Sequence, residues 1–303
     1  MLFFIPFRRI GSERPQSPTD FSSKSIGLGG EAVRGAYGKI GSLLRRGLSE
    51  PVHGGFDAAA PAWAAEVVSS NIVGYNKITL TDNLTMVASQ FKNVGAGAKD
   101  IQEFFSDNSL PGFDMTAFAF QSTLQVWEGT GYTTYYWAAD GDGDLLGDSS
   151  LNKKWLDENY SVATENMNLG KAFWVETADT DVFVVEAGEV EDGATKVVPV
   201  SSGLTMLSNP FPVQTSIQSI VPDATIPGFD MSTFAFQTTL QVWDGTGYNT
   251  YYWAADGDGD LLGDATLNGK WLDENYAAVS ASIDIGKGFW FETTGAGNLT
   301  FSK

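Results

Sequence analysis

A chain of 303 residues with 43% hydrophobic and 13% aromatic residues is long and apolar enough for packed globular cores. Its formal net charge of -19 argues against nucleic acid as a partner, because nucleic-acid binding depends on Lys and Arg that neutralise phosphates. The chain has no cysteine, which excludes disulfides and thiolate metal sites. No apolar run reaches the roughly 18 residues expected of a transmembrane helix, so we expect no transmembrane segment.

Residues 1–70 form a basic leader that contains every arginine of the chain. Gly, Ser and Pro with little apolar periodicity predict a disordered segment. The run Ala62-Trp63-Ala64 fits the small-residue rule of signal peptidases, so we expect cleavage after Ala64 and an extracellular or cell-surface protein. A clear apolar region before this site is missing, and an organelle transit peptide or a start codon assigned too far upstream are alternative interpretations.

Two near-copies of one sequence follow the leader. Residues 110–160 recur almost unchanged as residues 226–276, and the similarity extends outward on both sides. Each copy spans about 110 residues, which is domain size and too long for a solenoid unit. We therefore expect two domains, which we call the first repeat (71–190) and the second repeat (191–303).

Strand signals dominate the repeats when they are read in chain order. Short alternating or apolar stretches are separated by Gly, Asn and Asp turns, with one short helical stretch at 100–105. This pattern predicts an all-β protein with minor helix, built as two tandem antiparallel β-sandwich or barrel-like modules. The strands expected in the first repeat are residues 77–81, 84–89, 124–127 and 132–137 (a β-hairpin), 172–175 and 182–185.

Three short stretches carry a resemblance to a class of known proteins: Leu207–Phe211, Gln241–Tyr248 and Gly286–Trp290, with their counterparts in the first repeat. They resemble secreted bacterial β-repeat modules of surface or extracellular proteins that carry Asp-x-Asp-x-Asp calcium loops. The resemblance implies an extracellular and structural role. It implies no active site.

Each repeat contains the sequence Asp-Gly-Asp-Gly-Asp-Leu-Leu-Gly-Asp, whose alternate carboxylates are typical of calcium loops. Calcium takes six to eight oxygen ligands, and a Gly-spaced backbone can curl to bring alternate carboxylates together. Four carboxylates within nine residues also repel one another unless a cation or strong hydrogen bonds neutralise them. The predicted ligands are Asp140, Asp142, Asp144, Asp148 and the Leu146 carbonyl, and Asp256, Asp258, Asp260, Asp264 and the Leu262 carbonyl.

The loop departs from the EF-hand because Leu145 replaces its glycine and Leu151 its final glutamate. A further ligand could come from Asp157 or Glu158. The alternatives to calcium are a solvated acidic turn, since Asp and Gly form turns readily, or another metal. Magnesium fits less well because it prefers a tighter octahedron with several waters.

The aromatic residues and the single histidine bear on catalysis and glycan binding. Each repeat holds four tryptophans and a Tyr-Tyr-Trp run, which we interpret mainly as core packing, with stacking on sugar rings as the alternative. The only histidine is His53 in the leader, so a Ser/His/Asp triad within the repeats is excluded. Adjacent carboxylates such as Asp157 and Glu158 face opposite ways on a strand, and we expect no enzyme.

Duplication suits binding or assembly better than a single catalytic cleft, because similar surfaces at two places favour repeated contacts between copies. The sequence therefore predicts a secreted, calcium-binding structural protein that self-assembles into a filament, tube or surface layer, with itself and calcium as partners. The alternative is a calcium-dependent carbohydrate-binding or adhesive module with a glycan partner.

Overall fold

The computed structural model describes residues 73–81, 83–95, 97, 99–104, 109–179 and 182–303. The chain divides into two compact units, Met1–Ala65 and Glu66–Lys303. The first unit, and with it the predicted leader and the cleavage site after Ala64, lies outside the described residues. All strand pairs of the described part are antiparallel, which confirms the predicted all-β class. No described helix is long and apolar enough to cross a membrane.

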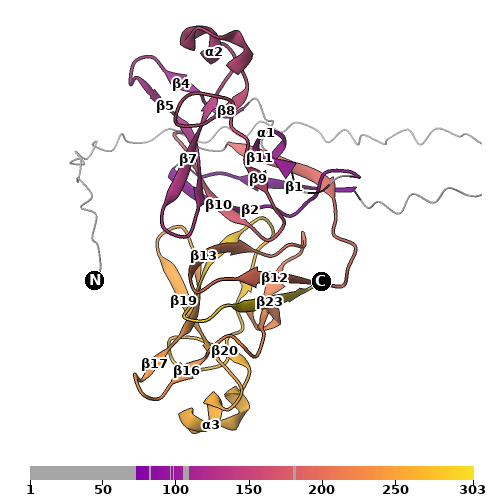
Figure 1. The fold of residues 1–303 in the computed structure, drawn as a ribbon, viewed down its shortest axis with the longest axis vertical. Helices are drawn as coiled ribbons and strands as arrows, with labels where there is room; N and C mark the ends of the chain where they lie inside the picture. The colour runs from indigo at the N-terminus through magenta and orange to yellow at the C-terminus, as the bar shows by residue number, and fades with distance from the viewer. Residues whose placement is uncertain (1–72, 82, 96, 98, 105–108, 180–181) are drawn as a thin grey trace, which may run out of the picture. The chain divides into compact units, whose positions relative to one another are not determined.

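A five-stranded antiparallel sheet forms the centre of the first repeat, with strand order β2-β10-β6-β7-β8 (Figure 1). The predicted hairpin is confirmed, since β6 and β7 pair from Thr123 opposite Tyr136 to Trp127 opposite Tyr132. Gly129 in the connecting turn has a φ of 88°, which glycine adopts without steric cost. The strands are β2 (Asn83–Ala88), β6 (Ser122–Trp127), β7 (Tyr132–Ala138), β8 (Lys154–Leu156) and β10 (Ala172–Thr177).

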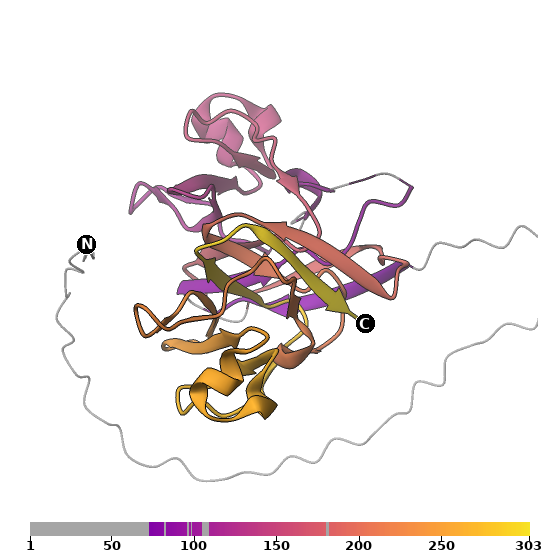
Figure 2. The ribbon, with the colours of Figure 1, turned by 60° about the horizontal axis from the view of Figure 1, so that its bottom comes forward.

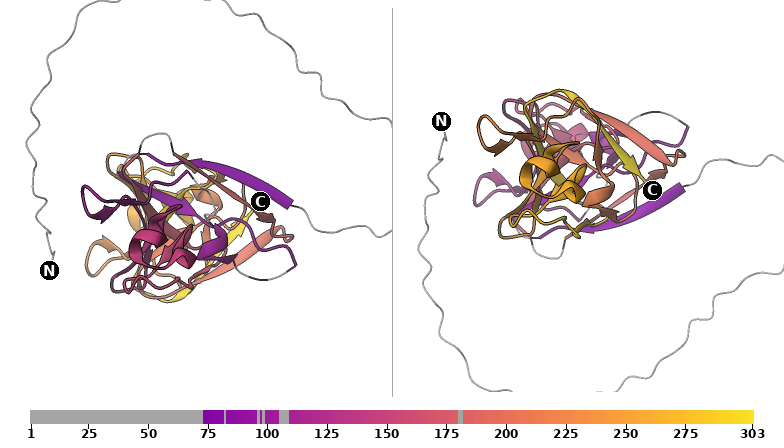
Figure 3. Two further views of the ribbon diagram at one scale, coloured as in Figure 1. Left: turned by 90° about the horizontal axis from the view of Figure 1, so that it is seen from above. Right: turned by 90° about the horizontal axis from the view of Figure 1, so that it is seen from below.

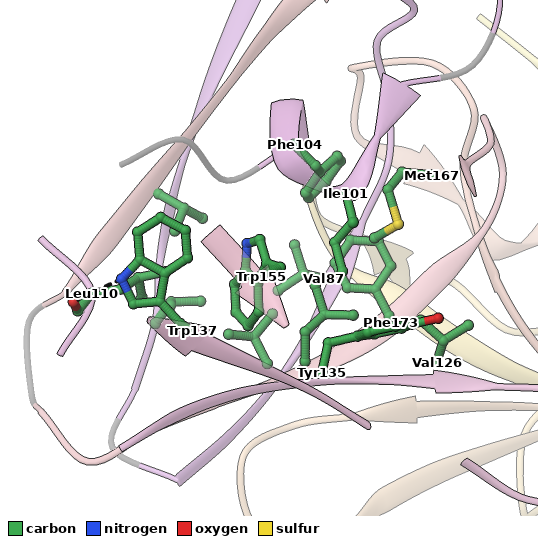
Figure 4. Packing of buried hydrophobic residues seen from close by; sticks show 14 of the residues in the cluster. Val87, Ile101, Phe104, Leu110, Val126, Tyr135, Trp137, Trp155, Met167 and Phe173 are labelled. Carbon is green, nitrogen blue, oxygen red and sulfur yellow. Dashed lines mark hydrogen bonds between the residues drawn. The ribbon is translucent and has the colours of Figure 1, made fainter. Parts of the chain in front are cut away.

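A second, two-stranded layer covers one face of this sheet. It consists of β1 (Val73–Thr79) and β11 (Phe183–Glu189), which run antiparallel to each other (Figure 2). The core between the layers is apolar and includes several aromatic side chains, with Trp137 and Trp155 almost fully buried (Figure 4). The prediction that most tryptophans serve packing is confirmed. Such aromatic side chains contribute much of the buried area of a core.

The second repeat has the same construction. Its five-stranded sheet follows the equivalent order β13-β22-β18-β19-β20, and a three-stranded sheet β12-β23-β15 covers it. The large strands are β13 (Gly203–Ser208), β18 (Thr238–Trp243), β19 (Tyr248–Ala254), β20 (Lys270–Leu272) and β22 (Gly288–Thr293). The covering strands are β12 (Thr195–Val200), β15 (Val221–Pro222) and β23 (Gly297–Ser302).

Short elements connect the strands in both repeats. The predicted helix at 100–105 is present as α1, and a 3₁₀ turn takes its place in the second repeat. The short elements are β3 (Lys99–Asp100), α1 (Ile101–Phe104), β4 (Phe113–Asp114), β5 (Ala119–Phe120), α2 (Asp142–Leu146), η1 (Ser149–Leu151) and β9 (Asn166–Met167), then β14 (Thr215–Ser216), η2 (Ile217–Ser219), β16 (Phe229–Asp230), β17 (Ala235–Phe236), α3 (Asp258–Leu262), η3 (Ala265–Leu267) and β21 (Ser282–Ile283).

The two repeats pack against each other through the second faces of their five-stranded sheets. Alternation along β10 sends Phe173 into the first core and Ala172 and Trp174 to the opposite face. There they meet Met206 and Trp290 of the second repeat in a separate cluster. Both faces of β10 are therefore buried, which explains its nearly continuous apolar sequence.

Contacts between the repeats are reciprocal. The Ala88 amide donates to the Gly286 carbonyl at 3.0 Å, and the equivalent Ser208 amide donates to the Gly170 carbonyl at 2.8 Å. The closest approach joins Ala172 to its counterpart Gly288, where a Cβ on the glycine would lie 2.4 Å from the Ala172 Cβ. Equivalent residues thus meet across an approximate two-fold axis, as in a symmetric dimer.

One set of polar contacts between the repeats, made by Gln90, has no counterpart across this axis among the described residues. The Gln90 side chain donates to the carbonyls of Asn209 (3.3 Å) and Phe211 (2.9 Å) and accepts from the Gly286 amide (3.0 Å). The Gln90 backbone amide in turn donates to the fully buried Glu186 carboxylate. A fully bonded buried network of this kind fixes one arrangement of the two repeats.

Candidate functional site

The aspartate-rich segment of each repeat leaves the sheet after β7 or β19 and folds into a single helical turn, α2 or α3 (Figure 1). In the first repeat the helix lies between Gly141 and Gly147, whose φ angles are 92° and 88°. Only glycine adopts such left-handed angles without steric cost, so these two residues determine where the helix begins and ends. The predicted ligand residues Leu146 and Leu262 end α2 and α3.

The second aspartate of each segment is turned inward. Asp142 is 7% exposed, and its Oδ2 accepts hydrogen bonds from the amides of Phe113 and Ala139, both at 2.7 Å. Gly112 must lack a side chain, because a Cβ there would lie 1.9 Å from this oxygen. The equivalent Asp258 makes the same bonds in the second repeat. This carboxylate therefore joins the segment to the first residue of β4 or β16.

The remaining carboxylates have separate partners. Asp144 Oδ2 accepts from the Asn152 amide group at 3.0 Å, as Asp260 does from Asn268. Asp148 Oδ1 accepts from the Ser150 amide at 2.9 Å, and hydrogen bonds from Ser150 lower the Asp148 pKa. Asp264 caps η3 in the same way. In the first repeat, Oδ2 of the exposed Asp140 lies 3.2 Å from Lys153 Nζ. The equivalent Asp256 of the second repeat has no such lysine, because Gly269 stands at the position of Lys153.

Asn152 holds the helical turn in place, although the pattern of carboxylates does not predict this role. Its Oδ1 accepts from the amides of Gly141 (3.1 Å) and Gly143 (2.7 Å). In the second repeat Asn268 accepts from Gly259 at 2.6 Å. The signal was present in the sequence, since Asn follows the same Leu in both repeats. Side-chain amides often bond to nearby backbone in turns of this kind.

The predicted calcium ligands thus do not converge. Across the described ranges, no group of three or more His, Cys, Asp or Glu side chains is placed to hold a metal ion. For the second, third and fourth aspartates of each segment, hydrogen bonds from backbone amides and asparagine supply the neutralisation that a cation would otherwise give. The spacing of the aspartates therefore has a structural explanation in both repeats, and calcium binding stays a prediction.

No known protein family, curated protein or solved structure matches this chain. Two features occur in both repeats: an apolar hairpin tip and a polar groove.

The hairpins β4–β5 and β16–β17 expose large apolar side chains. Met115 and Phe118 at the first tip are 59% and 78% exposed, and Met231 and Phe234 at the second are 46% and 77% exposed. Phe118 and Phe234 also have φ angles of 51° and 53°, an uncommon conformation for a bulky residue. We call these pairs the Met–Phe tips. The two hairpins that carry them lie on the same side of the structure (Figures 1 and 3).

A groove runs beside β7 in the first repeat and beside β19 in the second. The cavities measure about 430 and 460 Å³ and are lined by equivalent tyrosines, threonine or asparagine and acidic residues. In the first repeat these include the half-exposed Tyr132 and the adjacent Asp157 and Glu158. Asp157 is occupied locally, because its Oδ1 accepts from the amides of Asn159 and Ser161. A groove lined by tyrosines and polar side chains offers both stacking and hydrogen bonding.

We expect Asp142→Ala to lower the free energy of unfolding by about 2 kcal/mol, because it leaves two amides without their acceptor in a mostly buried site. Asp144→Ala should cost less, since its carboxylate bonds to one exposed side chain. Urea unfolding with calcium chelated measures both effects. An effect of Asp142→Ala that appears only when calcium is present would contradict the structural role of this carboxylate.

Proposed function

We propose that the protein is a non-catalytic, extracellular structural protein that associates with further copies of itself through its Met–Phe tips. The observation that carries this proposal is the duplication of an exposed Met and Phe pair in both repeats. Exposed apolar side chains that cluster at one place mark interaction sites more often than single exposed residues do. A chain with two equivalent tips can contact two neighbours at once.

A second copy of the chain is the occupant that the chemistry favours. The repeats already bury Met86, Met206 and two tryptophans against each other, so this fold packs stably against a near-copy of itself. With a net charge of -19, two copies repel each other over most of their surface. Apolar tips supply attraction that does not depend on charge.

Light scattering over a range of concentrations tests the proposal. We expect the wild type to form species larger than dimers, because each chain has two tips. The single variant Phe118→Ser should stop at dimers, and the double variant Phe118→Ser/Phe234→Ser should be monomeric. Tyr75→Ser is the matched control, because Tyr75 is 79% exposed but lies on β1 outside the tips. A wild type that is monomeric at every concentration would refute self-assembly.

Calcium is a further part of the proposal and rests on the spacing of the carboxylates. Binding would require Asp144 to exchange its bond with Asn152 for the metal, and Asp140 to leave Lys153. We expect calorimetric titration of calcium to release or absorb heat in the wild type and to give none in Asp144→Asn/Asp260→Asn. Identical titrations of the two proteins would remove calcium from the proposal. The light-scattering series repeated with a chelator then shows whether assembly needs the metal.

Glycan binding is the second candidate function, and the two equivalent grooves favour it. Tyrosine rings beside threonine, asparagine and carboxylate side chains can stack on a sugar and hydrogen-bond its hydroxyls. A glycan array with the whole chain tests this candidate. Absence of any bound glycan would count against it without bearing on self-assembly.

A further inference from the structure

Equivalent lysines in the two repeats have different surroundings. In the first repeat, Lys171 Nζ lies 2.7 Å from Glu165 Oε1 and 3.8 Å from Glu128 Oε1. The Tyr135 hydroxyl donates to the other oxygen of Glu165 at 3.1 Å. The Glu165 carboxylate thus joins a lysine and a tyrosine, and Tyr135 is buried.

The second repeat keeps the lysine and the tyrosine, as Lys287 and Tyr251, but has Ala281 where the first has Glu165. A cavity of about 490 Å³ lies at this place, lined by Tyr251, Ala281 and Lys287 among others. Tyr251 is only partly buried, whereas Tyr135 is 7% exposed. The cavity therefore includes the space that the Glu165 side chain fills in the first repeat.

The polar groups in this cavity lack the partners of their counterparts. Within the part of the chain that the structure describes, Lys287 makes no ion pair and the Tyr251 hydroxyl no hydrogen bond. Burial lowers the Lys287 pKa, and the nearby Asp284 opposes this shift only in part. An anion in contact would relieve the unfavourable burial of this ammonium group.

Two aspartates also line the cavity, but each has a partner of its own. Asp284 Oδ1 accepts from the Gln214 amide group at 2.9 Å. Asp244 Oδ1 accepts from the amides of Thr246 and Gly247, within its own turn. The first repeat shows that a lysine at this position accommodates two carboxylates, Glu165 and Glu128. Neither place is taken beside Lys287 among the described residues, because Ala281 stands at the position of Glu165 and Asp244, at the position of Glu128, makes no ion pair with it.

An apolar wall adjoins the lysine. In the first repeat the indole N–H of Trp127 donates to the Leu204 carbonyl at 2.8 Å, and the ring lies 5.5 Å from Trp290. Its counterpart Trp243 lies 6.1 Å from Trp174 and lines the cavity. The volume falls within the range of small-molecule sites. A ligand there has room for a body as well as a charged group.

We propose that the cavity between the repeats binds a small organic carboxylate, whose charged group contacts Lys287 and Tyr251 as Glu165 contacts their counterparts, and whose body lies against Trp243. The site is separate from the Met–Phe tips, so the test of carboxylate binding is independent of the test of self-assembly. No bond is made or broken, because the proposal concerns binding alone.

Titration of benzoate into the whole chain, followed by saturation-transfer NMR, tests this site. We expect benzoate to bind and the neutral isostere benzamide to bind at least about tenfold more weakly, since one charged contact is lost. Ala281→Glu should abolish benzoate binding, because it restores the side chain that fills the first repeat. Lys287→Gln should weaken binding about tenfold and checks the same contact without filling the cavity.

Ser280→Glu is the control for added negative charge, because Ser280 is exposed and does not line the cavity. It should keep the wild-type affinity for benzoate. Equal benzoate affinity in the wild type, Ala281→Glu and Lys287→Gln would overturn the proposal, and so would equal affinity for benzoate and benzamide. Circular dichroism confirms that each variant is folded before the comparison.

Discussion

Gly288→Ala should destabilise the protein by about 1–3 kcal/mol, although it adds a single methyl group, because an overpacked interior cannot relax freely. The new Cβ would lie 2.4 Å from the Ala172 Cβ and 3.0 Å from the Met86 Cγ. Both neighbours are buried in the cluster between the repeats, where Trp174 and Trp290 limit movement. Urea unfolding measures the loss, and a glycine-to-alanine exchange in a strand would otherwise favour folding.

The approximate two-fold axis supplies the control for this prediction. Ala172 and Gly288 are equivalent residues, so the double variant Ala172→Gly/Gly288→Ala moves the methyl group across the axis without changing the total volume. We expect the double variant to recover most of the stability that Gly288→Ala loses. If the stability losses of the single variants Ala172→Gly and Gly288→Ala simply add in the double variant, the two positions do not share one contact, contrary to the reciprocal packing described above.

The strands were predictable from the sequence because alternation and turn residues act locally. The hairpin of β6 and β7 and the helix α1 lie within a few residues of their expected places. The packing of the repeats against each other was not predictable, since an apolar strand such as β10 does not reveal which partner covers its second face. The strands that cover it, β13 and β22, both belong to the second repeat.

The aspartate segment shows the limit of reading a site from its charged residues. A pattern of alternate aspartates reports the carboxylates but not the backbone amides that can satisfy them. Asp142 is held by amides from two separate stretches, at Phe113 and Ala139, and Asn152 holds the turn. The cavity beside Lys287 was visible in principle, since Glu165 and Ala281 differ at equivalent places. Only the structure shows that this difference leaves a space.

Lys99→Met should lower the free energy of unfolding by about 3 kcal/mol at pH 8, because it leaves the buried Glu186 carboxylate without a cation. Lys99 Nζ lies 3.7 Å from Glu186 Oε1, and the two side chains are 3% and 0% exposed. The lysine also donates to the Ala187 carbonyl. Lys196→Met is the matched control, since its 3.1 Å pair with Glu191 is far more exposed and should contribute at most about 1 kcal/mol.

The pH dependence separates the buried charge from simple loss of packing. Burial raises the Glu186 pKa from 4.5 to about 7, although Lys99 and the amides of Gln90 and Phe91 oppose the shift. The Glu186 carboxyl therefore binds its proton more tightly in the folded protein than in the unfolded chain. As pH rises from about 4.5 to about 7, Glu186 makes folding progressively less favourable. Above that window its contribution to the free energy of unfolding is constant. Glu186→Gln should remove this slope, which thermal melting of both proteins between pH 5 and pH 8 measures.

The same window decides how Lys99→Met acts. At pH 5 Glu186 is mostly protonated in the folded protein, so the loss of its cation should cost less than at pH 8. Lys99→Met/Glu186→Gln removes both charges and should be more stable than Lys99→Met alone at pH 8, because no buried charge is left unpaired. The side-chain oxygen that Glu186→Gln retains can still accept from the amides of Gln90 and Phe91, so Gln90 stays in position to contact the second repeat. If Lys99→Met instead lowers the free energy of unfolding equally at pH 5 and pH 8, the decrease comes from lost packing contacts of the lysine side chain and not from the unpaired charge.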